Sequence, residues 1–234
     1  MKTPEERYKN SRKSFWQAFI MTIFVFIIGI FLGITYEGNN LNKMNDYYVQ
    51  SEIFLLDTLA LSKITDTELN NNSIKCELLI DANIEFADRI YVEARSLERY
   101  EEAGKLTDSL NALHKKYDLL RIILWINTLN VPNECKTNAS TIVYLYERNT
   151  EDLTKKATNN VWSKILFDLK QEKGNEIILI PIATDSNLTS LNVLTSKFNV
   201  TEKPVLIINN KQIITKLRSE EEIKKYLNNY NISS

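Results

Sequence analysis

The sequence is poor in the residues from which most catalytic and metal sites are built. Its 234 residues include one histidine, two cysteines and five glycines. A single histidine, His114, excludes a histidine-based metal cluster, and neither a Gly-rich phosphate loop nor a GxSxG motif occurs. We therefore expect no metal, no cofactor and no catalytic residue. Because Lys115 and Lys116 follow His114, we also expect its imidazole to be solvated.

An excess of positive charge is absent as well. The chain has 29 Lys and Arg against 30 Asp and Glu, so its net charge at pH 7 is −1. Proteins that hold nucleic acid usually present a basic patch to the phosphates. The sequence therefore predicts no nucleic-acid partner.

One uncharged run is long enough to cross a membrane. Residues Phe15–Ile34, FWQAFIMTIFVFIIGIFLGI, carry no charged side chain. At about 1.5 Å of rise per residue, a helix of this length spans roughly 30 Å, the thickness of a bilayer core. We expect a transmembrane helix over residues 14–36 that contacts lipid through Phe15–Ile34. A cleaved signal peptide is the alternative, but its apolar region is usually shorter and Ile34-Thr35-Tyr36 is a poor cleavage site.

The basic residues around this run predict its orientation. Lys2, Arg7, Lys9, Arg12 and Lys13 precede it, whereas the next basic residue after it is Lys43. Basic residues flanking a membrane span favour the cytoplasmic side. We expect a single-pass protein of the cell membrane, with a cytoplasmic tail over residues 1–13 and all later parts on the extracytoplasmic side.

Residues 41–131 form a predicted helical stalk. Amphipathic patterns predict helices over residues 41–63, 74–102 and 105–129, and the short connection at Ala103-Gly104 makes the last two antiparallel neighbours. The last helix carries a seam of apolar residues at alternating spacings of four and three, typical of a coiled coil. The seam consists of Leu106, Leu110, Leu113, Tyr117, Leu120 and Leu124. Residues 122–126 are apolar on nearly every face, so we expect the 41–63 helix or a partner protein to cover them.

The two cysteines lie at similar distances from the bend at Gly104. Cys76 lies about 28 residues before it and Cys135 about 31 after it, so an antiparallel hairpin brings them to the same level. A disulfide is expected in an oxidising compartment, and two separate buried thiols are the alternative. We predict a Cys76–Cys135 disulfide.

Beyond residue 138 the pattern changes to alternating strands and helices. Strands are predicted over residues 141–146, 177–183, 203–208 and 212–214, with helices over 151–172, 189–198 and 219–229. Asn209-Asn210 suits a tight hairpin turn because asparagine tolerates a positive φ. Ser219 and Glu222 have the spacing of a capping box.

This order resembles the thioredoxin fold over about residues 140–230. The most specific part of the resemblance is FNVTEKPVLIINNKQII, Phe198–Ile214. It implies a cis peptide bond before Pro204, at a position that lies beside the active-site dithiol in that family. The predicted fold class is an α+β multidomain protein: a transmembrane helix, an extracytoplasmic helical hairpin or three-helix stalk, and an α/β thioredoxin-like domain over residues 138–231.

The dithiol of that family is missing from this chain. The positions nearest to the Cys-x-x-Cys motif are Thr150 and Leu153, and neither can form the thiolate that attacks a disulfide. Thr150 followed by Glu151 and Asp152 instead predicts a helix cap, with acidic residues near the positive end of the helix dipole.

Asn-x-Ser/Thr sequons occur at Asn71, Asn138, Asn187, Asn199 and Asn231. Asparagine is so abundant that chance accounts for most of them. Asn71, Asn138 and Asn231 fall in predicted loops or the tail, where a glycan is most easily carried. These three are the glycosylation candidates.

Three functions are compatible with this organisation. The preferred one is a redox-inactive, membrane-anchored thioredoxin-like protein that binds or scaffolds an unknown protein partner. The resemblance places the contact surface at Lys203 and Pro204 together with Asn149, Thr150 and Glu151. One alternative is an extracytoplasmic thiol-disulfide oxidoreductase, or a thiol-dependent folding factor, that uses Cys76 and Cys135. The other is a structural homo-oligomer built on the helical stalk.

Overall fold

The computed structural model describes residues 15–35, parts of 49–60, 72–102, 108–131, 135 and 139–228. The chain divides into two compact units, Met1–Tyr47 and Tyr48–Ser234, which are described separately here. The glycosylation candidates Asn71, Asn138 and Asn231 lie outside the described residues, as does the bend at Gly104. Those residues between 49 and 60 that are described are helical, and the rest of the predicted 41–63 helix lies outside the description.

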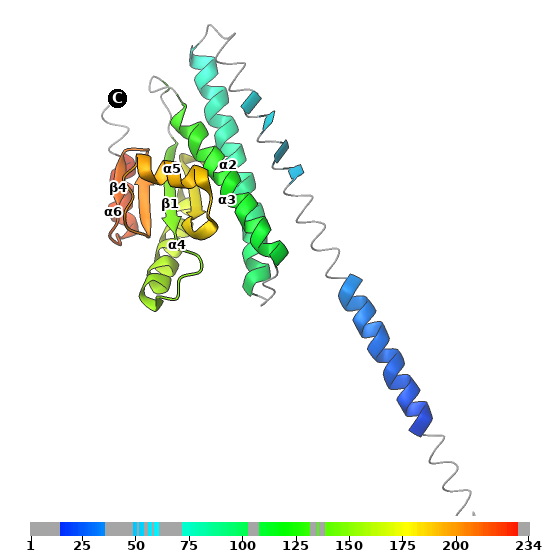
Figure 1. The fold of residues 1–234 in the computed structure, drawn as a ribbon. Coiled ribbons are helices and arrows are strands. Elements are labelled where there is room, and N and C mark those ends of the chain that lie inside the picture. Colours follow the sequence, from blue (N-terminus) through cyan, green and yellow to red (C-terminus); the bar gives the residue numbers. More distant parts are fainter. Residues whose placement is uncertain are drawn as a thin grey trace, which may run out of the picture. The chain divides into compact units, whose positions relative to one another are not determined.

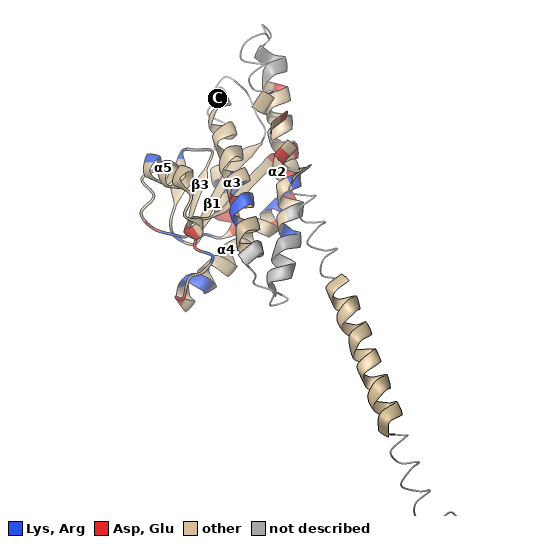
Figure 2. Ribbon diagram, turned by 45° about the vertical axis from the view of Figure 1, so that its right-hand side comes forward, with Lys and Arg blue, Asp and Glu red and all other residues tan. Residues whose placement is uncertain are grey.

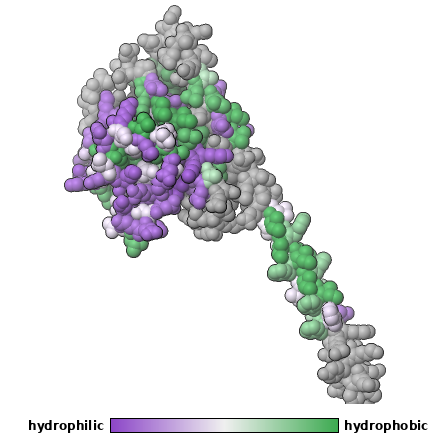
Figure 3. All heavy atoms as spheres, viewed as in Figure 1, coloured by the Kyte–Doolittle hydropathy of each residue, from purple (hydrophilic) through white to green (hydrophobic). Residues whose placement is uncertain are grey.

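The first unit contains one apolar helix, Phe15–Thr35, among its described residues. It is 21 residues long with a mean hydropathy of 2.7, and Figures 2 and 3 show it without charge and largely hydrophobic. The hydroxyls of Thr22 and Thr35 donate hydrogen bonds to the carbonyls of Ala18 and Phe31, at 2.9 and 2.8 Å, so the helix satisfies these polar groups internally. By length and composition this helix is able to cross a membrane, a property that it shares with signal sequences.

The second unit is built on a four-stranded sheet. Its strand order is β2-β1-β3-β4, with β1 parallel to β2 and antiparallel to β3, and with β3 antiparallel to β4. The bounds agree closely with the predicted strands, except that the third strand is shorter. They are Ser140–Tyr146 for β1, Ile177–Ala183 for β2, Val205–Ile208 for β3 and Gln212–Ile214 for β4.

Helices cover this sheet because β1 and β2 are apolar along nearly their whole length. Both are buried at almost every position, as strands enclosed on two faces are. On one face, Trp162 and Leu166 of α4 and Ile223 of α6 pack with Ile142 and Tyr144 of β1 in a single core cluster. The helices that follow the strands are α4 (Leu153–Lys173), α5 (Thr189–Lys197) and α6 (Glu220–Asn228), with short 3-10 turns η1 (Gly174–Glu176) and η2 (Thr184–Ser186).

Two long helices, α2 (Asn72–Glu102) and α3 (Asp108–Leu129), lie side by side (Figures 1 and 2). Both contact β2, the strand at one edge of the sheet. The segment predicted as a separate stalk therefore packs against the sheet that follows it, inside the same compact unit. The two helices cover an edge strand that would otherwise expose its unpaired backbone groups.

The apolar end of α3 is covered by the carboxyl-terminal part of the chain. Trp125 is fully buried, its ring stacks on Phe198 with centroids 5.2 Å apart, and its Nε1 donates to Asn210 Oδ1 at 2.9 Å. Phe198, at the end of α5, thus supplies an aromatic surface for Trp125. The expectation that the 41–63 helix or a partner protein covers residues 122–126 stays a prediction, because most of that helix lies outside the described residues.

The predicted Asn209-Asn210 turn and the predicted Ser219/Glu222 capping box are confirmed. Asn209 and Asn210 both have positive φ, 50° and 56°, between β3 and β4. Glu222 accepts a hydrogen bond from the backbone nitrogen of Ser219 at 3.0 Å, and Ser219 Oγ accepts one from the backbone nitrogen of Glu222 at 3.3 Å, which is a capping box. The Lys203–Pro204 peptide bond is cis, as the resemblance implied.

The two cysteines meet at one end of the α2–α3 pair. Cys76 and Cys135 form a disulfide, with their Cα atoms 5.2 Å apart and 59 residues between them in sequence. The predicted Cys76–Cys135 disulfide is thus confirmed. In the chain-entropy description, closing a loop of this length stabilises the folded state by about 4 kcal/mol.

Candidate functional site

The carboxyl ends of β1 and β2 meet at the same edge of the sheet because the two strands are parallel. Thr184, just after β2, donates its hydroxyl to the carbonyl of Tyr146 at 3.0 Å. Asp185 accepts from the backbone nitrogens of Arg148 and Asn149 at 3.1 and 2.8 Å. These bonds fix the loop between β1 and α4 against the end of β2.

A buried carboxylate from α3 joins the same strand ends. The side chain of Asp118 is 0% exposed and accepts from Arg121 Nη1 at 3.3 Å and Arg148 Nη2 at 3.2 Å. It also accepts from the backbone nitrogen of Ala183 at 3.3 Å and from the hydroxyl of Ser186. A buried charge is tolerated when it is paired and hydrogen-bonded in this way. We call these five residues the Asp118 cluster.

A pocket of about 480 Å³ lies next to this cluster. Its walls come from α2, α3, the end of β1, β2 and α4. Its lining is rich in tyrosine and in basic and amide side chains. The polar and aromatic lining residues are Tyr91, Arg95, His114, Tyr117, Arg121, Tyr144, Tyr146, Glu147, Arg148, Lys156, Asn159, Asn160, Ser163 and Phe167.

Stacked tyrosines form part of the pocket wall. Tyr144 and Tyr146 lie two residues apart on β1 and thus on one face of the sheet, with ring centroids 5.1 Å apart and an interplanar angle of 11°. The Tyr144 hydroxyl lies 3.4 Å from the side-chain oxygen of Asn159. Burial, with a contribution from Tyr146, raises the pKa of Tyr144 well above its ordinary value. Its hydroxyl therefore stays protonated and donates to Asn159.

Cationic side chains outnumber carboxylates in the pocket wall. Arg95, Arg121, Arg148 and Lys156 line it, whereas Glu147 is its single carboxylate. Glu147 already forms an ion pair of 3.1 Å with Lys155. Arg95 is also held in place, with its guanidinium carbon 4.8 Å from the centre of the Phe167 ring. The described pocket therefore carries an excess of positive charge.

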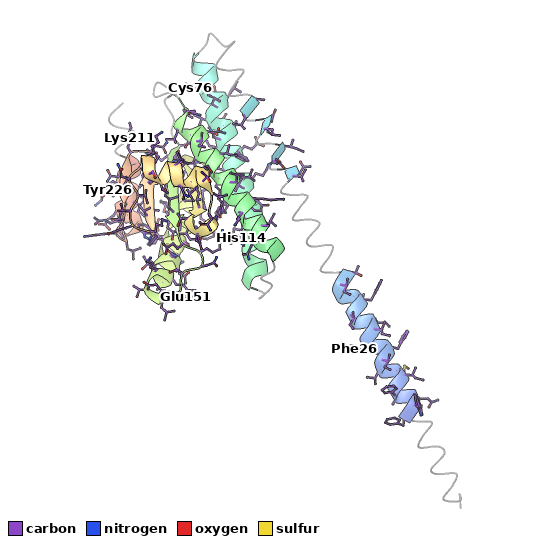
Figure 4. The ribbon with its side chains drawn as sticks, in the orientation of Figure 1. Phe26, Cys76, His114, Glu151, Lys211 and Tyr226 are labelled. Carbon is purple, nitrogen blue, oxygen red and sulfur yellow. A yellow bond between two sulfur atoms is a disulfide. The ribbon has the colours of Figure 1, made fainter. Side chains whose placement is uncertain are left out.

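The prediction of a solvated His114 is wrong. The side chain is only 5% exposed and lines the pocket. Figure 4 labels it on α3. Burial is the main cause that lowers its pKa from 6.5 to about 3, and Arg148 and Arg121 lower it further. His114, Asp118 and Arg121 follow one another at helical spacing on the buried face of α3, whereas the neighbours Lys115 and Lys116 are exposed. That spacing was the sequence signal for the site.

The residues expected to bind a partner do not line this pocket. Lys203 and Pro204 are half-buried just before β3, and Thr150 is half-buried in the loop between β1 and α4. Asn149 and Glu151 are exposed in that same loop, where Figure 4 labels Glu151. The pocket residues were missed because they come from five elements that only the folded chain brings together.

The helix cap also differs from the prediction. Asp152, and not Thr150, is the N-cap of α4: its Oδ1 accepts from the backbone nitrogens of Thr154 and Lys155 at 2.8 and 3.2 Å. Thr150 acts one step earlier, its hydroxyl accepting from the backbone nitrogen of Asp152 at 3.3 Å. The reason is that α4 begins at Leu153, which makes Asp152 the last non-helical residue.

Comparisons with known proteins give little further information. No family model matches this chain, and no curated protein matches it. A solved structure described as "Structure of a malarial protein" is similar to it at 18% sequence identity, covering 39% of this chain and 96% of the other, with a TM-score of 0.31. A likeness at this level supports no argument about function.

Replacing the buried carboxylate should destabilise the protein. In Asp118→Asn, the neutral amide no longer balances Arg121 and Arg148, so we expect a loss of about 3 kcal/mol in the free energy of unfolding. Urea unfolding of the full chain in detergent, followed by tryptophan fluorescence, measures it. Asp168→Asn, which removes the exposed partner of Lys164, is the matched control and should cost less than about 1 kcal/mol. Equal losses in the two variants would contradict a structural role for the cluster.

His114 should make the protein less stable in mild acid. Its folded pKa of about 3 lies below the ordinary 6.5, so between these values the unfolded chain binds a proton that the folded chain does not. Stability is thus fully present above pH 6.5 and falls as the pH drops toward 3, by up to about 1.4 kcal/mol per pH unit. The comparison is between unfolding free energies of the wild type and of His114→Gln across this range. The variant should have the flatter profile, and parallel profiles would show that His114 titrates normally.

Proposed function

We propose that this chain is a single-pass, membrane-anchored binding protein whose extracytoplasmic part carries a thioredoxin-like domain without redox activity. The observation that carries the proposal is the sheet order β2-β1-β3-β4, with β1 parallel to β2 and the last two strands antiparallel. The thioredoxin fold has a core of this order. The apolar helix Phe15–Thr35 supplies the anchor, and the basic residues before it favour a cytoplasmic amino terminus.

The chemistry of the matching site supports binding over catalysis. Thr150 and Leu153 occupy the positions nearest to the missing dithiol, and residues 138–234 contain no cysteine. Neither a hydroxyl nor an alkyl group can supply the thiolate that exchanges with a disulfide. A fold by itself does not imply an activity, so the loss of the thiols removes the reason to assign one.

The two alternative functions have less support. An oxidoreductase would have to use Cys76 and Cys135, which lie 59 residues apart in sequence and outside residues 138–231, and Cys135 is buried, which hinders attack by a thiolate. A homo-oligomer built on the α3 seam would need that seam to be free. Tyr117, Leu120 and Leu124 of the seam are instead buried within the chain.

The surface that we propose for the partner combines Lys203 and Pro204 with Asn149, Thr150 and Glu151. The backbone around Pro204 lies beside a strand, where an extended segment of a partner can form main-chain hydrogen bonds. The loop residues offer exposed polar groups, and Asp185 holds the backbone of Asn149 in a fixed position. The partner is therefore expected to be an extended protein segment.

The first test places a photoreactive amino acid at residue 203 of the full chain in its native membrane. Irradiation should give a discrete crosslinked protein because residue 203 lies on the proposed contact surface. Lys216, an exposed lysine between β4 and α6, is the matched control position and should give none. Identical crosslinking patterns from residues 203 and 216 would exclude a specific partner at this surface.

The second test restores the missing thiols. In Thr150→Cys/Leu153→Cys, two sulfurs are placed at the start of α4, where the thioredoxin-like alignment requires them to reach each other. Mild oxidation of the folded full-length variant should then join them, as peptide mapping by mass spectrometry can show. A folded variant whose two new thiols stay separate under oxidation would show that the alignment of residues 150–153 is wrong.

A further inference from the structure

We propose that Asn187 and Asn199, at the two ends of α5, are N-glycosylation sites. The three sequons expected to carry glycans lie outside the described residues, whereas these two lie within them. The inference rests on the extracytoplasmic placement of the second unit in the proposed function, because N-glycans are added on that side of a membrane. It does not depend on the partner surface around Pro204.

Both asparagines are exposed and occupy turns. Asn187 ends the η2 turn with φ 53° and ψ 48°, and Asn199 follows α5 with φ 52°. The helix closes at Asn199: the backbone nitrogens of Asn199 and Val200 donate to the carbonyls of Ser196 and Thr195 at 3.1 and 2.9 Å. Neither asparagine side chain forms a hydrogen bond within the part of the chain that the structure describes. A bulky polar group attached to either side chain therefore extends into solvent and breaks no contact.

The left-handed backbone explains the asparagines but not the threonines that follow them. Asparagine and glycine tolerate a positive φ, so either residue would suit these two turns. Thr189, in the first turn of α5, and Thr201, between α5 and β3, are both exposed. Neither hydroxyl has a hydrogen-bond partner among the described residues, so the local structure does not use them. A hydroxyl two residues after asparagine, with no proline between, completes a glycosylation acceptor.

The modification needs a co-substrate carried by the membrane. This donor is an oligosaccharide linked to a polyisoprenyl diphosphate, and an oligosaccharyltransferase of the same membrane catalyses the transfer. The side-chain nitrogen of asparagine attacks the anomeric carbon of the first sugar and loses one proton. A carbon–nitrogen bond forms, the bond between that carbon and the diphosphate oxygen breaks, and the lipid diphosphate leaves with the electron pair. The transfer therefore uses neither an oxidant nor a reductant.

Glycans at these two positions would cover the outer face of α5, which Figure 2 shows at the edge of the second unit. Leu191 and Leu194 of this helix are buried in the core, whereas Val193 is 65% exposed. The helix is nine residues long, so its two ends lie about 13 Å apart. A hydrophilic glycan at each end screens Val193 from the apolar surfaces of other molecules.

Site-specific mass spectrometry of the full chain, purified from its native membrane, tests the two sites. An amidase that releases N-glycans converts each glycosylated asparagine to aspartate, so the peptides that contain residues 187 and 199 report each site separately. Release in heavy-oxygen water marks this conversion and distinguishes it from spontaneous deamidation. We expect marked aspartate at both positions, and each asparagine is decided by its own peptide.

Variants of the two threonines are the matched controls. Thr189→Ala and Thr201→Ala remove the hydroxyl and keep the asparagine, so each should abolish the glycan at its own site alone. Thr189→Ser and Thr201→Ser keep a hydroxyl and should keep the glycan. Both threonines are exposed, so we expect the variants to fold, and the Cys76–Cys135 disulfide reports whether they have.

A reporter sequon in a carboxyl-terminal tag separates failure of this inference from failure of the proposed topology. A glycosylated tag beside unmodified Asn187 and Asn199 would overturn the inference and leave the topology intact. An unmodified tag beside unmodified asparagines would overturn it as well, and protease added to intact cells then decides the topology. Digestion of the tag would leave the extracytoplasmic placement standing, whereas a protected tag would overturn that placement too.

Discussion

The arrangement of the second unit depends on one buried carboxylate. Asp118 has no exposed surface, so partners inside the protein must balance its charge. These partners come from three places in the chain: Arg121 on its own helix, Arg148 after β1, and Ala183 with Ser186 at the end of β2. The same contact therefore joins α3 to the carboxyl ends of both parallel strands. Apolar packing can hold a helix against a sheet in several registers, but a buried charge allows few, because any shift would leave it without its donors.

The pocket follows from the same contact. Because Asp118 holds α3 against the strand ends, Tyr144 and Tyr146 face a helix that carries His114 and Arg121. Arg121 and Arg148, the two guanidinium groups paired with Asp118, also help to keep His114 neutral. The stability of the fold and the electrostatic character of the cavity thus share one cause.

Local patterns predicted much of this fold and little of the site. Features that depend on short runs of residues or on distance along the chain were predictable. They are the strands, the Asn209-Asn210 turn, the capping box and the Cys76–Cys135 pair. The docking of the helices on β2 was not predictable, since a seam of five leucines and one tyrosine does not indicate what it packs against. His114 was misread because its neighbours Lys115 and Lys116 are charged, although a helix places successive residues on different faces. The pocket joins residues from 91 to 181, and no single motif spans that distance.

The packing of α2 and α3 against β2 has a further consequence for contacts between copies of the chain. A seven-residue apolar strand with a bare flank is a template on which another copy can add its own strand, the first step toward aggregation. Here the hairpin occupies that flank, and the opposite one is formed by β4, which is only three residues long and includes an exposed glutamine, Gln212. Neighbouring copies therefore find little strand backbone on which to add a strand of their own.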